Sequence, residues 1–173
     1  GSGVIVDLSR WSAIGAVDVA RRTVIVGPGA TRGAVDAAAH AHGLRFPVDP
    51  SSGAFCTIGG MASTNAAGAH SMKFGSTRRW VNAIDCVFAD GTRASIARGA
   101  PPPRGIPAID RFLALAPTLV QAEGATPSIH PGVLKESSGY AIADFAGSGE
   151  LVDLLVGSEG TLAFFAGLEL ALV

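Results

Sequence analysis

The sequence predicts an α+β domain in which a mixed or antiparallel sheet is flanked by helices. Three observations predict it: β-branched runs that end at turn residues, helix-length segments with capping residues, and no regular succession of strand, helix and strand. The chain has 173 residues, 48% hydrophobic and 16% charged, so it can bury a core and intrinsic disorder is excluded. This length is typical of one domain, and the proline-rich run 99–105 is the best candidate for an internal boundary.

The first elements of the chain are predicted to be strands. Residues 4–8 (Val-Ile-Val-Asp-Leu) have the composition of a short buried strand. Residues 16–20 and 23–26 are expected to form the two arms of a hairpin, whose second arm ends at the turn residues Gly27-Pro28-Gly29.

A helix is predicted over residues 32–42. Thr31 is suited to its N-cap, because a threonine hydroxyl can accept a hydrogen bond from a backbone N–H of the first turn. Gly43 supplies the left-handed residue that commonly follows a helix. Helical spacing places four residues on one face: Val35, Ala38, Ala39 and His42.

The remaining elements follow from the same signals. Residues 46–55 are predicted to be a loop, and residues 58–67 a short helix with Gly59 and Gly60 in its first turn. Asp90-Gly91 predicts the turn of a hairpin between strands 81–89 and 92–96. The last elements are expected to be a helix over 109–122 that is interrupted near Pro117, a short helix over 150–156, and a long strand over 161–172.

Charge and cysteine content exclude several classes of partner. The 13 basic and 14 acidic residues give a net charge of -1, and the arginines are scattered, so no binding to nucleic acid is predicted. No segment reaches the ~18 consecutive apolar residues of a membrane span. Cys56 and Cys86 cannot form a disulfide framework, so we expect a reducing compartment and a cytoplasmic location.

Several common cofactor-binding and catalytic motifs are incomplete or absent in this sequence. Gly27 and Gly29 fit the start of a nicotinamide-binding fingerprint, but Arg32 occupies the position of its third glycine. No phosphate-binding P-loop is present, and residues 157–160 lack the spacing of a serine nucleophile elbow. The four histidines have no zinc-ligand spacing, so no metal site is predicted.

Three glycine-rich segments are the unusual feature of a chain that contains 23 glycines. The first segment is residues 49–53, the second is residues 56–68, and the third is residues 157–162. Each is rich in small and hydroxyl residues and nearly free of charge, which allows backbone N–H groups to approach an extended ligand. A helix that begins near Gly59 would add a dipole that favours a phosphate. The alternative is that these small residues serve close packing alone.

Taken in order, the motifs resemble the FAD-binding domain of the FAD-linked oxidases, the PCMH-type domain found in vanillyl-alcohol-oxidase and glycolate-oxidase-subunit relatives. The resemblance is greatest to the branch of D-lactate and D-2-hydroxyglutarate dehydrogenases. It covers residues 4–173 and is weakest between Pro101 and Pro131. Residues 1–173 are therefore expected to be a fragment of an FAD-binding domain, with an inserted segment at about 99–131. The motifs are Asp-Pro-Ser-Ser (49–52), Cys-Thr-Ile-Gly-Gly (56–60), Ser-Thr-Asn-Ala-Ala-Gly (63–68), Lys-Phe-Gly (73–75) and Gly-Ser-Glu-Gly-Thr-Leu (157–162).

The resemblance implies that FAD contacts the loop 49–55, the second segment and the third segment. The residues expected to bind it are Asp49, Pro50, Ser51, Ser52, Gly53, Phe55, Thr57, Gly59, Gly60, Ala62, Ser63, Thr64, Asn65, Gly68, Glu159, Gly160, Thr161 and Leu162. His70 could face the flavin or carry it covalently, although a loop histidine bonded to backbone is the commoner arrangement. For Tyr140 we expect a packed ring with an exposed hydroxyl.

The implied activity is oxidation of a small 2-hydroxy acid by hydride transfer to FAD. Electrons would then pass to an acceptor or an iron–sulfur module elsewhere in a longer protein. Relatives carry a pyrophosphate loop before the position of Val4 and a substrate-binding cap after Val173, so we expect this chain by itself to be inactive. No catalytic residue is assigned within it.

Departures from the family pattern keep two alternatives open. Relatives have Lys-Asn-x-x-Gly-Tyr-Asp where residues 135–141 read Lys-Glu-Ser-Ser-Gly-Tyr-Ala, and Ala163 replaces a usual glycine. The chain could therefore belong to a FAD-linked oxidase or reductase of another substrate class, acting on a sugar, a lactone or an enolpyruvyl sugar. It could also be a degenerate module that binds without catalysis.

Overall fold

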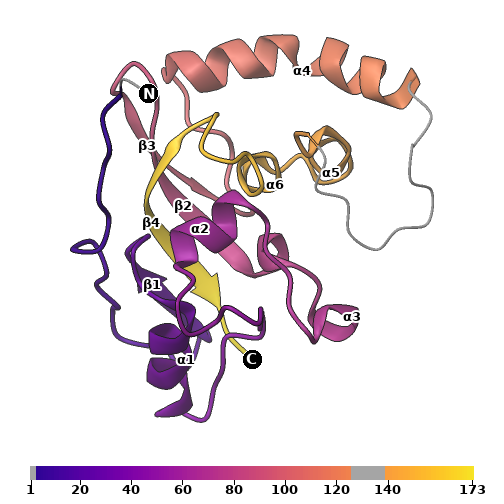
Figure 1. Ribbon diagram of the computed structural model, residues 1–173. Coiled ribbons are helices and arrows are strands. Elements are labelled where there is room, and N and C mark those ends of the chain that lie inside the picture. Colours follow the sequence, from indigo (N-terminus) through magenta and orange to yellow (C-terminus); the bar gives the residue numbers. More distant parts are fainter. Residues whose placement is uncertain (1–2, 126–138) are drawn as a thin grey trace.

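A four-stranded antiparallel sheet forms the centre of the molecule (Figure 1). The computed structural model describes residues 3–125 and 139–173. The strands are β1 (Thr23–Val26), β2 (Val81–Val87), β3 (Arg93–Ala97) and β4 (Phe164–Ala171), in the spatial order β1-β4-β2-β3. The last strand of the chain therefore lies between the first two and joins both halves of the sequence.

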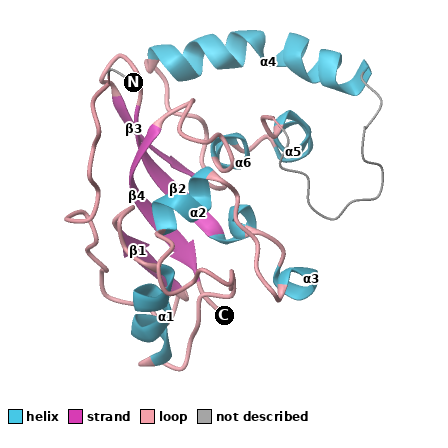
Figure 2. Cartoon of the chain, viewed as in Figure 1, coloured by secondary structure: helices cyan, strands magenta, loops and turns pink. Residues whose placement is uncertain are grey.

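Helices cover one face and one end of this sheet (Figure 2). In Figure 1, α2 and α6 lie in front of the strands and α4 runs across their upper end. The helices are α1 (Arg32–His40), α2 (Ile58–Ser63), α3 (Ser71–Phe74), α4 (Pro107–Ala125), α5 (Ile142–Ser148) and α6 (Leu151–Leu155), with a 3₁₀ turn η1 (Thr77–Trp80) before β2. In the described part of the chain, no helix combines the length and apolar character needed to cross a membrane.

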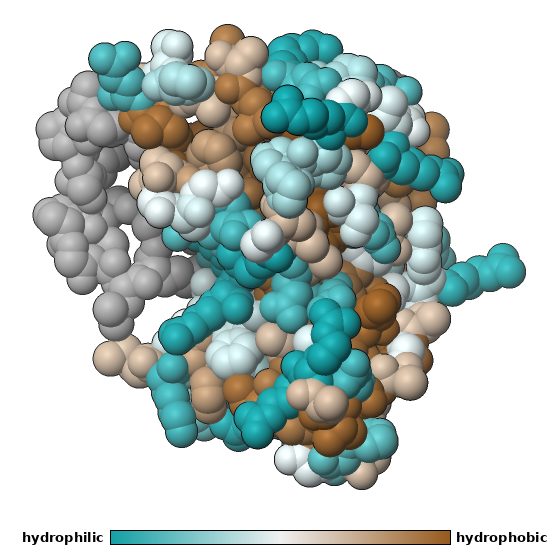
Figure 3. Space-filling model, turned by 180° about the vertical axis from the view of Figure 1, so that it is seen from behind, coloured by the Kyte–Doolittle hydropathy of each residue, from teal (hydrophilic) through white to brown (hydrophobic). Residues whose placement is uncertain are grey.

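The core lies between the sheet and these helices. Alternate residues of the central strands point into it: Leu168 and Leu170 of β4 are fully buried, and Ile84 of β2 pairs with Leu168. Ile58 of α2 and Val152 of α6 are fully buried within the same cluster. The opposite side of the sheet exposes polar residues such as Asp85 and Ser95, and Figure 3 shows hydrophilic surface across the middle of the molecule seen from behind.

Most predictions of single elements are confirmed. Thr31 caps α1, with its Oγ1 accepting a hydrogen bond from the N–H of Ala34, and Gly43 has a φ of +72°. The predicted hairpin forms as β2 and β3 around Asp90-Gly91. Helix α1 ends at His40, so His42 is exposed beyond it, while Val35 and Ala39 are buried.

Other elements begin or end where tertiary contacts place them. The helix predicted over 58–67 ends at Ser63, because Asn65 adopts a positive φ of +48° that no helix continues. The helix predicted over 150–156 spans Leu151–Leu155 and the last strand begins at Phe164. Helices α3 and α5 and the turn η1 were not predicted.

Three predictions are wrong. Residues 4–8 are not a buried strand: Val4 and Ile5 are 92% and 95% exposed, and no strand among the described residues pairs with them. Residues 16–20 do not form a hairpin arm, since only the single bridge Asp18↔Thr23 joins that stretch to β1. Helix α4 is not interrupted, because Pro117 lies on its exposed side while Ile109 and Ala116 are packed.

Candidate functional site

The three glycine-rich segments meet in the folded chain. The N–H of Ala69 donates to the carbonyl of Asp49 over 3.0 Å, which joins the end of the second segment to the first. The N–H of Gly157 donates to the carbonyl of Ala62 (2.9 Å), and the N–H of Glu159 donates to that of Ser63 (2.8 Å). These bonds place residues about 100 positions apart in one continuous surface.

The predicted site residues differ in exposure. Buried positions serve packing between the segments, and exposed positions are available to a ligand. Ser51, Ser52, Phe55, Gly60, Thr64, Glu159, Gly160 and Thr161 are exposed; Asp49, Pro50, Thr57, Ser63, Gly68 and Leu162 are half-buried; and Gly53, Gly59, Ala62 and Asn65 are buried.

The start of α2 does not offer the free donors that a phosphate would need. The N–H groups of Ile58 and Gly59 donate to the carbonyls of Ala30 and Pro28, each over 2.8 Å. The N–H of Gly60 is bonded to Thr57 Oγ1 over 3.2 Å. The expectation that the beginning of this helix favours a phosphate is therefore wrong, because the protein itself satisfies those donors.

Thr57 consequently acts as a cap, and Thr31 offers a matched comparison. Both side chains accept a hydrogen bond of 3.2 Å from the N–H three residues later. We expect Thr57→Ala and Thr31→Ala each to lower the free energy of unfolding by about 1 kcal/mol, measured by urea denaturation. FAD affinity should fall by no more in the first variant than in the second. A loss of FAD affinity in Thr57→Ala that Thr31→Ala does not show would instead indicate that a phosphate of the ligand binds at the start of α2.

Arg32 holds the first segment in place. Its guanidinium donates to the carbonyls of Val48 (3.0 Å) and Phe46 (3.2 Å) and lies 3.5 Å from Asp49 Oδ1. Asp36 pairs with the same guanidinium over 3.3 Å and accepts from the N–H of Phe46. The loop that enters the site is thus fixed to α1 by partly buried polar contacts, which no local sequence pattern indicates.

His70 and Tyr140 both lie at the edge of this surface. His70 Nδ1 is 3.6 Å from Asp49 Oδ2, so the imidazole pairs with the first segment. The hydroxyl of Tyr140 lies 2.9 Å from Thr161 Oγ1, and that threonine hydroxyl donates to the carbonyl of Ser158. The hydroxyl is exposed as expected, but the expectation of a packed ring is wrong, because Tyr140 is 49% exposed. Residues 135–138 of the altered family motif lie outside the described residues.

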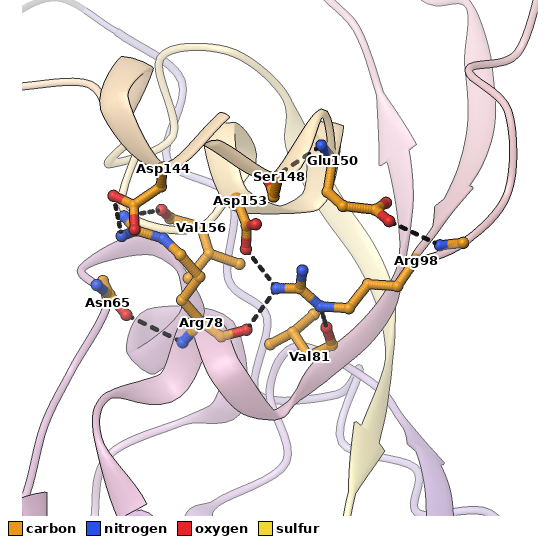
Figure 4. A network of polar contacts seen from close by, with 10 residues as sticks. Asn65, Arg78, Val81, Arg98, Asp144, Ser148, Glu150, Asp153 and Val156 are labelled. Carbon is orange, nitrogen blue, oxygen red and sulfur yellow. Dashed lines mark hydrogen bonds and ion pairs between the residues drawn. The ribbon is translucent and has the colours of Figure 1, made fainter. Parts of the chain in front are cut away.

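A second polar network links α5, α6 and β3 to the same region (Figure 4). Arg78 reaches Asp144, while Arg98 reaches Asp153 and the carbonyls of Val81 and Arg78. Burial of the Asp153 carboxyl opposes its ionisation, but hydrogen bonds from Arg98 and Ser148 and the charges of Arg98 and Arg78 outweigh this effect and lower its pKa.

Cys86 offers no reactive thiolate, and the described residues hold no cluster of metal ligands. Burial of Cys86, together with the charge of Asp85, raises the pKa of its thiol to about 12, so it stays protonated. No group of three or more His, Cys, Asp or Glu side chains within residues 3–125 and 139–173 could hold a metal ion. An apolar cavity of about 110 Å³ lies beneath α4, where Phe88, Ile109 and Leu155 line it.

Sequence comparison decides the family. The profile of the FAD binding domain matches residues 1–97, more than half of the chain. The chain belongs to the FAD binding domain family. This confirms the resemblance drawn from the motifs.

Curated relatives carry the names of dehydrogenases and oxidases. The D-lactate dehydrogenase of Archaeoglobus fulgidus is 32% identical over 161 residues, which cover 93% of this chain and 26% of that protein. The D-2-hydroxyglutarate dehydrogenase of Pseudomonas putida is 30% identical over 174 residues, covering 94% of this chain and 17% of that protein. The glycolate oxidase subunit GlcD of Escherichia coli is 32% identical over 98 residues, which cover 57% of this chain and 20% of that protein. The chain spans only 17% to 26% of the length of these three relatives.

Solved structures support the fold. An alkyldihydroxyacetonephosphate synthase superposes with a TM-score of 0.60 at 18% identity, over 96% of this chain and 22% of that one. At this identity the match shows a shared fold alone.

The residues fit the cofactor of this family. The exposed positions of the three joined segments carry hydroxyls and backbone amides and only one charge, that of Glu159. Gly160 has a φ of +76°, and a Cβ built on it would meet nothing within 4 Å, so space is open there for a ligand. Such a surface suits the uncharged flavin ring and ribityl chain of FAD, bound through many weak polar contacts, better than its anionic pyrophosphate.

Proposed function

We propose that this chain is the FAD-binding part of a flavin-dependent dehydrogenase that oxidises a 2-hydroxy acid of the D-lactate or D-2-hydroxyglutarate type. Membership of the FAD binding domain family and the names of the curated relatives support the proposal. The junction of the three glycine-rich segments is the single observation that carries it, because it assembles one surface from residues around positions 49, 62 and 157.

The exposed members of the three segments, together with Phe55 of the loop 49–55, are the proposed FAD contacts. Ser51, Ser52 and Phe55 would contribute from the first loop, Gly60 and Thr64 from α2 and its exit, and Glu159, Gly160 and Thr161 from the third segment. Half-buried and buried members would support them. Fragment 1–173 is proposed to be one FAD-binding unit, and α4 falls within the proposed insertion at about 99–131, of which residues 126–131 lie outside the described residues.

Bound FAD supplies a hydride acceptor for the Cα hydrogen of the substrate, and the protein supplies position and electrostatics. The residues of this chain would bind the cofactor along the joined segments and keep water from the face they cover. The base that takes the hydroxyl proton and the groups that bind the substrate carboxylate are proposed to lie elsewhere in a longer protein. The same holds for the electron acceptor or iron–sulfur module.

The test is the visible spectrum of the purified full-length protein. We expect flavin absorption bands, and we expect D-lactate or D-2-hydroxyglutarate to bleach them under anaerobic conditions while L-lactate does not. A protein without flavin bands would contradict FAD binding and favour a degenerate module. A protein that holds flavin but is reduced by neither D-hydroxy acid would contradict the substrate class and favour another FAD-linked reaction.

A further inference from the structure

We propose that Arg78 is a positioning residue of the cofactor site, which fixes the third glycine-rich segment against the second. This inference rests on the proposed function, because the two segments it joins are proposed FAD contacts. Arg78 itself touches neither the proposed ligand nor the reacting atoms.

The contacts of Arg78 reach the ends of both segments. Its Nη2 donates to the carbonyl of Val156 over 2.9 Å, one residue before the third segment begins. Its backbone N–H donates to Asn65 Oδ1 over 3.0 Å, at the exit of α2 within the second segment. Asn65 and Val156 are both buried, so these bonds are shielded from water.

Gly157 shows how closely the segments depend on this side chain. A Cβ built on Gly157 would lie 3.2 Å from Arg78 Nη2 and 3.2 Å from the Cβ of Asn65. The glycine also has a φ of +94°, which an L side chain rarely adopts. The backbone of the third segment therefore lies directly on the guanidinium and on the asparagine.

Two further residues hold Arg78 itself. Asp144 Oδ2 of α5 lies 2.8 Å from Nη1, so the guanidinium is fixed by a carboxylate on one nitrogen and by a carbonyl on the other (Figure 4). Arg98 Nη2 donates to the backbone carbonyl of Arg78 over 2.8 Å. A planar fork with several fixed donors can satisfy Asp144 and Val156 together, whereas the single ammonium of a lysine cannot reproduce that geometry.

The experiment measures FAD dissociation constants of the full-length protein after removal and return of the cofactor. Arg78→Met should weaken FAD binding by about 10- to 100-fold, since hydrogen bonds to a charged group are lost. Arg78→Lys should recover part of this loss. Arg79→Met serves as the matched control, because Arg79 is the next residue of η1 and is exposed; its FAD affinity should not change.

A second comparison separates positioning from general destabilisation. Val24→Ala removes buried side-chain atoms from β1, a strand that carries no residue of the three segments, and should lower Tm without changing FAD affinity or the visible circular dichroism of bound flavin. Arg78→Met should change both. If Arg78→Met does not fold, Asp144→Asn is tested instead. The Asp144 carboxylate is half-exposed, so its replacement should destabilise the fold only slightly while it removes the ion pair that holds Arg78.

The outcomes distinguish the two proposals. A wild-type protein that binds no FAD overturns the proposed function and the role of Arg78 with it. A wild-type protein that binds FAD, with Arg78→Met or Asp144→Asn affected no more than Val24→Ala at equal loss of Tm, overturns the role of Arg78 alone.

Discussion

Gly68→Ala is expected to break the junction between the first and second glycine-rich segments. A Cβ built on Gly68 would lie 2.6 Å from the backbone nitrogen of Asp49 and closer still to its carbonyl carbon and oxygen. Carbon atoms do not approach backbone atoms this closely, so one of the two chains must move. Asp49 is held by the N–H of Ala69, by an ion pair with Arg32 and by the imidazole of His70, whose Nδ1 lies 3.6 Å from its carboxylate, so it has little freedom to yield.

We expect this variant to lose about 4 kcal/mol or more of unfolding free energy, measured by urea denaturation, and to lose FAD binding. Gly147→Ala is the control: its Cβ would meet nothing within 4 Å, and it lies within α5. That change should stabilise the protein by about 0.5–1 kcal/mol. Wild-type stability and FAD affinity in Gly68→Ala would show that the two segments are not packed as described.

Asp153→Asn is expected to produce the second largest effect. Asp153 is 8% exposed and bonds Arg98, whose guanidinium also donates to the carbonyls of Val81 and Arg78. Neutralising the carboxylate leaves the Arg98 charge without its partner at the centre of the network in Figure 4. Loss of one partner of a buried pair costs about 3–5 kcal/mol, but the Arg98 side chain is 27% exposed, so solvent screening reduces the expected loss to about 2–3 kcal/mol.

The pH dependence of this variant has a definite sign. The folded-state pKa of Asp153 is lowered, so the pair contributes stability above the ordinary carboxyl pKa of 3.8 and loses it as pH falls through the folded-state value. Asp153→Asn has no such contribution to lose, so the stability difference from wild type should stay constant well above the ordinary carboxyl pKa of 3.8 and shrink only as pH falls below it toward the folded-state value. Asp85→Asn, at an exposed carboxylate of β2, should change stability by less than about 0.5 kcal/mol. A difference between Asp153→Asn and wild type that does not vary with pH would contradict this role.

Local chemistry made much of the chain predictable. Thr31 and Gly43 mark the ends of α1 because capping and a left-handed residue act within one helical turn. Asp90-Gly91 sets a hairpin because a tight turn fixes the pairing of the strands beside it. The ordered motifs also identified the FAD-binding family, which the match to residues 1–97 confirms.

Expectations failed where the outcome depends on a distant partner. Residues 4–8 have the composition of a strand, but a strand requires a neighbour to pair with, and their side chains are exposed. Pro117 is tolerated within α4 because its position faces outward, which only packing decides. The donors at the start of α2 were expected to be free, yet Ala30 and Pro28 accept from them.

By itself, the sequence determined the family, most helix and strand positions, and which segments are small and uncharged enough to approach a ligand. Only the tertiary structure decided that those segments meet, which of their residues remain exposed, and that Arg32 and Arg78 hold them. The physical reason is the sequence separation over which each interaction acts. Capping, turn formation and side-chain alternation act within a few residues, whereas Arg78 contacts Asn65 and Val156 across 13 and 78 positions, and no local pattern encodes such a contact.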